Sequence, residues 1–95
     1  MAWQIEVSET AKKQLAKIDH QAQRDIWRFL QDRIATDEDP MRFGAPLRKN
    51  LSGLWKYRVG NYRLICDIQG NRLIVLVVRV GHRREVYQGK VRLAE

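Results

Sequence analysis

The chain has 95 residues, one cysteine, two histidines and a formal net charge of +7. This length fits one domain, residues 1–95, with a single modest core. One cysteine excludes an internal disulfide, and the distant histidines lack the spacing of a zinc site, so no metal or other cofactor is expected. No apolar run approaches the roughly 20 residues of a membrane helix, and no signal peptide is visible, which favours a cytoplasmic protein without a membrane partner.

The positive charge is concentrated in the second half of the chain. Residues 1–41 hold six Lys/Arg and eight Asp/Glu, whereas residues 42–95 hold twelve Lys/Arg and three Asp/Glu. A solvated basic surface would explain this asymmetry through solubility alone. Twelve cations gathered in one half, partly on one sheet face, favour a polyanionic partner.

A short strand followed by two helices is predicted at the start of the chain. Residues 3–7 alternate apolar and polar side chains, and Ser8 is a good N-cap for a helix that ends near Asp19. A second helix is predicted from about residue 21 to residue 34, and the short break implies a helical hairpin. Residues 36–46 have the composition of a loop.

Residues 54–67 are the most informative segment, because they read as two strands joined by a Gly60-Asn61 turn. A two-residue turn fixes which residues lie opposite one another. The predicted cross-strand pairs are Val59 with Tyr62, Arg58 with Arg63, Tyr57 with Leu64, and Lys56 with Ile65.

Alternation along these two strands separates the side chains into two faces. Lys56, Arg58 and Arg63 share one face, where the directly opposed arginines form a like-charge pair that costs stability. A sheet that concentrates cations in this way is typical of a site that holds an anion. The other face is apolar and aromatic, and it is formed by Trp55, Tyr57, Val59, Tyr62, Leu64 and Cys66.

A third strand, residues 72–80, is predicted after a second two-residue turn at Gly70-Asn71. It is apolar on both faces and therefore belongs in the interior of the sheet. In this register Arg79 lies on the aromatic face near Tyr62. The order β-α-α-β-β-β predicts an α+β fold, in which the helical hairpin covers one face of an antiparallel sheet and the basic face stays open.

Two motifs resemble a known family. Residues 53–63, Gly-Leu-Trp-Lys-Tyr-Arg-Val-Gly-Asn-Tyr-Arg, resemble the core motif of the RelE/ParE toxin superfamily. Residues 80–87, Val-Gly-His-Arg-Arg-Glu-Val-Tyr, resemble the C-terminal motif of its RelE branch. The resemblance implies the RelE-like microbial RNase fold and a toxin of a type II toxin–antitoxin pair, a metal-independent endoribonuclease that cuts mRNA in the A site of the 70S ribosome. Its implied partner is a RelB-like antitoxin.

The resemblance also implies roles for particular residues. Lys56 and Arg58 match the two basic residues of the family's second strand, and Arg63 matches its third-strand arginine. Arg83 and Tyr87 match the C-terminal arginine and tyrosine. The founding member has a lysine where this chain has Arg58, which keeps the charge and adds a bidentate fork but cannot deprotonate.

RNA cleavage by its own 2′-OH needs a base, cations for the transition state and an acid for the departing 5′-oxygen. We hypothesise that Tyr87 is the base, because nearby cations lower the pKa of a phenol, and that Arg83 assists the leaving group. His82 is the rival base or acid. The further cations predicted to hold substrate phosphates, beside His82, are Arg84, Lys90 and Arg92.

Two other functions stay open at this point. The ParE branch has the same fold but inhibits DNA gyrase and lacks the Arg…Tyr pair that Arg83 and Tyr87 supply here. A non-catalytic nucleic-acid-binding module needs only the basic sheet, and it predicts salt-sensitive binding without cleavage.

Overall fold

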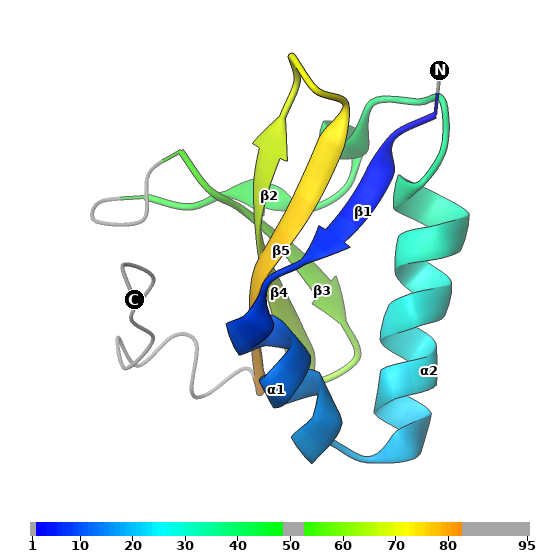
Figure 1. Ribbon diagram of the computed structural model, residues 1–95, viewed down its shortest axis with the longest axis vertical. Coiled ribbons are helices and arrows are strands. Elements are labelled where there is room, and N and C mark those ends of the chain that lie inside the picture. The colour runs from blue at the N-terminus through cyan, green and yellow to red at the C-terminus, as the bar shows by residue number, and fades with distance from the viewer. Residues whose placement is uncertain (1, 49–52, 83–95) are drawn as a thin grey trace.

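Two helices pack on one face of a five-stranded sheet (Figure 1). The computed structural model describes residues 2–48 and 53–82. The elements, in chain order, are β1 (Gln4–Val7), α1 (Glu9–Lys17), α2 (His20–Phe29), η1 (Leu30–Ile34), η2 (Pro40–Arg42), β2 (Ala45–Pro46), β3 (Trp55–Val59), β4 (Tyr62–Gln69) and β5 (Ile74–His82).

The strand order is β1-β5-β4-β3-β2, with β1 parallel to β5 and all other neighbours antiparallel. The predicted α+β class, with a helical hairpin on one face, is confirmed. The sheet is mixed rather than purely antiparallel, because β1 pairs in parallel with β5, while the helices carry the chain from β1 at one edge of the sheet to β2 at the other. Strand β2 has only two residues and was not predicted, because it lies within the segment predicted to be a loop.

Both helices begin at a side-chain cap. The Ser8 hydroxyl accepts a hydrogen bond from the backbone N–H of Ala11 at 3.1 Å, as predicted, and donates one to the carbonyl oxygen of Val78 at 3.2 Å. Asp19 caps α2 by accepting from the N–H of Ala22. The second predicted helix continues through the π-helical turn η1, so its predicted end at residue 34 is also confirmed. The hydrogen bond from Ser8 to Val78 also joins the start of α1 to β5.

The hydrophobic core lies between the helices and one face of the sheet, where α1 contacts β5 and α2 contacts β3. Strands β3, β4 and β5 supply its fully buried strand residues, which alternate along each strand except at the β-bulge in β5. Cys66 is among these buried residues, as predicted. The core consists of Ala11, Leu15, Ile26, Leu30, Ile34, Tyr57, Leu64, Cys66, Val75, Val77 and Val80.

The β3–β4 hairpin has the predicted register, including Arg58 opposite Arg63 and Lys56 opposite Ile65. Gly60 has φ +60° whereas Asn61 does not have a positive φ. This is the pattern of a type II′ turn, in which glycine takes the first central position. The turn therefore fixes which side chains face the core and which face away from it.

The β4–β5 connection differs from the prediction. Four residues, 70–73, join the strands, and Leu73 has φ +53°, whereas a two-residue Gly70-Asn71 turn was expected. Strand β5 also continues through His82. A β-bulge then shifts the register between Ile65 and Cys66, which leaves Val78 as the extra residue.

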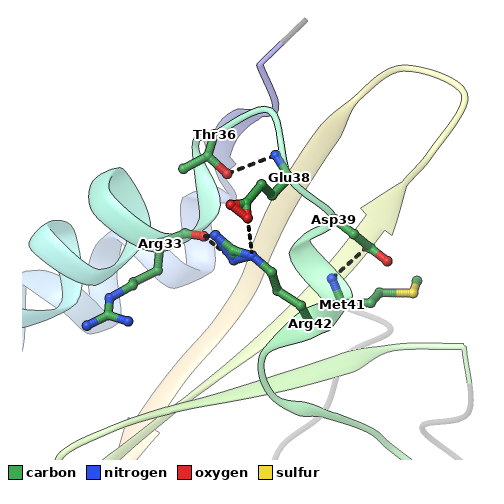
Figure 2. Close-up of polar contacts among 6 residues, drawn as sticks. All are labelled: Arg33, Thr36, Glu38, Asp39, Met41 and Arg42. Atoms are coloured by element: carbon green, nitrogen blue, oxygen red, sulfur yellow. Dashed lines mark hydrogen bonds and ion pairs between the residues drawn. The ribbon is translucent and has the colours of Figure 1, made fainter.

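The 36–46 loop leaves the end of η1 and crosses to the edge of the sheet. Arg42 donates to the carbonyl oxygen of Arg33 at 3.2 Å and to the carboxylate of Glu38 at 3.4 Å (Figure 2). The Asp39 carboxylate accepts the N–H of Met41 and so caps η2 (Figure 2). The loop therefore has internal order of its own, which its composition did not predict.

Two side chains of β3 hold this loop against the sheet. The Tyr57 hydroxyl donates to the carbonyl oxygen of Pro40 at 2.7 Å in a buried hydrogen bond. The Trp55 indole N–H donates to the carbonyl oxygen of Phe43, also at 2.7 Å. Since an unpaired buried polar group costs about 1–3 kcal/mol, both bonds strongly constrain the path of the loop.

Gly44 lies where the loop meets β3, and it has φ +74°. A Cβ at this position would overlap the carbonyl oxygen of Lys56 and lie 2.8 Å from Trp55 Nε1. Only glycine fits this close approach without moving the loop.

Gly44→Ala should therefore lower the free energy of unfolding by about 3 kcal/mol, because backbone strain and steric overlap add. Gly60→Ala is the matched control: Gly60 also has a positive φ, but nothing lies within 4 Å of the place that its Cβ would take, so the change should cost only about 1–2 kcal/mol. Urea unfolding measures both values. Equal losses in the two variants would contradict the close packing of Gly44 against β3.

Candidate functional site

Strands β3 and β4 bring together the three cations predicted from the hairpin. Lys56 and Arg58 alternate along β3, and Arg63 lies opposite Arg58 on β4, so all three belong to the face away from the helices. They line a hollow of about 260 Å³ at the edge of the sheet. Gly44, Ala45 and Tyr57 complete its lining.

The three cations differ in exposure. Arg58 is exposed and Lys56 is half-buried, whereas only 5% of Arg63 is exposed. The Arg63 guanidinium donates to the carbonyl oxygens of Tyr62 at 3.1 Å and of Gly60 at 3.4 Å. The basic face was predicted to be accessible to a ligand. Its cations are accessible mainly on β3, because the Arg63 side chain on β4 folds back toward the hairpin turn.

Arg79 belongs to the basic face, which corrects the prediction that it shares the aromatic face with Tyr62. It lies opposite Ile65 and is 9% exposed. The bulge is the physical reason, since one extra residue reverses the facing of every residue that follows in β5. A fourth cation thus lies beside the three predicted ones.

His82, the last residue of β5, lies on the opposite face. It pairs with Tyr62, and their rings make an edge-to-face contact with centroids 5.8 Å apart. Both residues line a separate hollow together with Lys17 and Ile18 at the end of α1. The structure therefore does not place His82 with Lys56 and Arg58.

The other predicted site residues lie outside the described residues. These are Arg83 and Tyr87, assigned to catalysis, and Arg84, Lys90 and Arg92, assigned to phosphate contacts. Their roles stay predictions.

Two residues of the hollow were missed from the sequence. Gly44 and Ala45 precede β3 by about ten residues, and their segment was predicted only as a loop. Pairing of Ala45 with Lys56 brings them to the site. Glycine at residue 44 indicated a turn but carried no sign of this long-range pairing.

Two titratable side chains of the same strands, Tyr57 and Cys66, are buried in the core. Burial is the main cause that raises the pKa of the Tyr57 phenol and of the Cys66 thiol above their usual values. Both groups are therefore neutral at physiological pH, and neither is suited to act as a base in the hollow.

Metal-ligand and membrane-spanning features are absent from residues 2–48 and 53–82. Within these ranges, no group of three His, Cys, Asp or Glu side chains is arranged to hold a metal ion. No helix there combines the length and the apolar character needed to cross a membrane.

Solved structures share this fold. The toxin–antitoxin complex RelBE2 of Mycobacterium tuberculosis is similar with a TM-score of 0.79 and 29% identity, covering 87% of this chain and 93% of that chain. A mutant of the E. coli toxin RelE in the free state is similar in fold, with a TM-score of 0.73 and 19% identity, covering 99% and 96% of the two chains. The fold is thus that of the RelE toxins.

Sequence comparison gives the family. Residues 5–87 match the model of the ParE toxin of the type II toxin–antitoxin system parDE. The toxin RelG of M. tuberculosis is 30% identical over 88 residues, which cover 93% of this chain and 99% of RelG. The chain therefore belongs to the RelE/ParE superfamily of type II toxin–antitoxin toxins.

The buried phenol and thiol predict alkaline destabilisation. Their raised folded pKa values mean that both groups keep their protons in the folded state and release them on unfolding, so the stability they contribute is present at neutral pH and is lost as pH rises above about 9. Cys66→Ala should lower stability at neutral pH through a cavity, but its stability should then fall less steeply above pH 9, by up to about 1.4 kcal/mol per pH unit. Urea unfolding of both proteins between about pH 8 and pH 10.5 tests this. Parallel pH profiles would contradict the buried, protonated state of the thiol.

Proposed function

We propose that this toxin is a cytoplasmic, ribosome-dependent endoribonuclease, which inhibits translation by cleaving mRNA in the A site of the 70S ribosome. The observation that carries the proposal is the hollow on the β3–β4 hairpin, where Lys56, Arg58 and Arg63 are gathered on one face. Three cations so close together favour a phosphate, because each contributes to the stabilisation of its negative charge.

The chemistry follows from the substrate. The 2′-oxygen of one nucleotide attacks the adjacent phosphorus, the bond to the 5′-oxygen breaks, and a 2′,3′-cyclic phosphate remains. The charge that develops on the phosphoryl oxygens would be stabilised by Lys56 and Arg58, which are the more accessible cations. Arg63 is held by the turn carbonyls and supplies a fixed positive charge beneath them.

The general base is proposed to be Tyr87, with Arg83 assisting the departure of the 5′-oxygen. The position of His82 favours this assignment over its rival, since His82 pairs with Tyr62 on the helix side of the sheet. Among the described residues of β3, β4 and β5, those that face the same side of the sheet as Lys56 and Arg58 include no histidine.

A second candidate function has one observation in its favour. The family model matched by residues 5–87 is that of ParE toxins, and the alternative is inhibition of DNA gyrase. The two candidates differ in product: cut messages in a translation extract support the nuclease, and gyrase-dependent DNA breaks support the alternative. Salt-sensitive RNA binding without either product would indicate a non-catalytic module.

The proposed partner is a RelB-like antitoxin. The similar M. tuberculosis structure is a toxin–antitoxin complex, and a toxin with this chain's basic half suits an acidic partner segment. A small acidic protein should therefore copurify with the toxin expressed from its native locus.

Cleavage kinetics test the proposed site. Lys56→Ala and Arg58→Ala should each lower the single-turnover rate of mRNA cleavage on ribosomes about a hundredfold or more, because each removes transition-state charge stabilisation of about 3 kcal/mol. Arg24→Ala is the charge-matched control: Arg24 is exposed on α2 and contacts Gln21, so its loss should leave the rate within about twofold of wild type.

The same assay separates the two candidate bases. Tyr87→Phe should lose most of the rate, whereas His82→Ala should retain most of it. A Tyr87→Phe variant with full rate removes the tyrosine from the mechanism, and full rates in both cation variants overturn the proposed site.

A further inference from the structure

The hollow has one uncharged wall, and this wall comes from β2. Ala45 pairs with Lys56 in the antiparallel ladder, and cross-strand partners place their side chains on the same face. The methyl group of Ala45 therefore stands beside the Lys56 side chain, on the face that carries the cations. Pro46 pairs with Trp55 and consequently has the opposite facing.

This wall cannot retreat, because the loop behind it is fixed at three points. The Tyr57 hydroxyl and the Trp55 indole N–H hold the carbonyl oxygens of Pro40 and Phe43, each at 2.7 Å. Gly44 packs so closely on β3 that it has no room for a Cβ. The size of the side chain at residue 45 therefore translates directly into the width of the hollow.

The chemistry of the two walls differs. Lys56, Arg58 and Arg63 offer donors and positive charge, whereas Ala45 offers only a methyl group and cannot form a hydrogen bond through its side chain. In RNA, a charged phosphate is always flanked by an uncharged ribose. A bound nucleotide can therefore place its phosphate against the cations and its ribose against Ala45.

We propose that Ala45 is a substrate-contacting position that sets the width of the site, and that the ribose beside the bound phosphate packs against its methyl group. This inference rests on the proposed function, because it assumes that the phosphate bound by Lys56 and Arg58 belongs to RNA. Ala45 acts by shape, and it takes no part in proton transfer.

The test compares two probes on the same variants. A fluorescein-labelled 2′-fluoro RNA hexamer, which lacks the attacking hydroxyl, reports nucleotide binding by fluorescence anisotropy. Inorganic phosphate, titrated as a competitor of a dye-labelled anion, reports the charged wall alone. Ala45→Val and Ala45→Leu should weaken RNA binding progressively, by at least about tenfold for leucine, because a larger side chain occupies the ribose position. Phosphate binding by Ala45→Leu should stay within about threefold of wild type, since the cations remain.

Pro46→Leu is the matched control, because the same side chain is introduced one residue away with the opposite facing. Its RNA affinity should equal that of the wild type. RNA binding by Ala45→Leu at wild-type affinity would overturn the inference, and equal loss of both probes would overturn the assignment of the ribose to this wall.

The two proposals fail separately. A wild-type protein that binds the RNA hexamer but cleaves no message on ribosomes overturns the nuclease, whereas the comparison of Ala45→Leu with Pro46→Leu still decides the ribose contact. In the cleavage assay, Ala45→Leu should raise KM and leave kcat unchanged. This result would support the inference, because it shows weaker substrate binding without a change in the chemical step.

Discussion

The register of the β3–β4 hairpin is the constraint on which the rest of the structure depends. Because the Gly60–Asn61 turn fixes Arg58 opposite Arg63, one face of the hairpin carries cations and the other carries core side chains. A shift by a single residue would bury the cations and expose the aromatic side chains. The like-charge pair costs stability, and the apolar packing on the opposite face of the same two strands offsets that cost.

Alternate residues of β3 connect the core to the site. Tyr57 packs in the core, with its ring centroid 5.4 Å from that of Phe29, and its hydroxyl holds the 36–46 loop. Its neighbours Lys56 and Arg58 face the other way and line the hollow. The loop held by Tyr57 returns to the sheet as β2 and supplies the uncharged wall. A change in core packing at Tyr57 would therefore also move this loop and alter the shape of the hollow.

Local patterns in the sequence predicted a large part of this arrangement. Ser8 indicated the start of α1, and the Gly-Asn dipeptide indicated the turn and hence the grouping of Lys56, Arg58 and Arg63. These features depend on residues that are neighbours in the chain, so propensity and alternation suffice to predict them.

The features that sequence reasoning missed depend on contacts between distant segments. The parallel pairing of β1 with β5 and the addition of Ala45 to β3 are set by tertiary packing. The bulge at Val78 reverses the facing of Arg79, and no residue type marks it in an apolar strand. The same holds for Gly44, because the atoms of Lys56, Trp55 and Tyr57 that leave no room for a Cβ there come from a distant strand.

The central claim is that the hairpin concentrates like charges in order to hold an anion. The most direct test measures the melting temperatures of wild type, Arg58→Gln and Arg24→Gln with and without inorganic phosphate at constant ionic strength. Without phosphate, Arg58→Gln should have a higher melting temperature than wild type. Its free energy of unfolding should be about 0.5 kcal/mol larger, because the substitution removes the like-charge pair. Phosphate should stabilise wild type and Arg24→Gln equally and Arg58→Gln distinctly less, since a ligand stabilises the state that binds it. Equal stabilisation of all three proteins would show a general salt effect and would contradict an anion site at the hairpin.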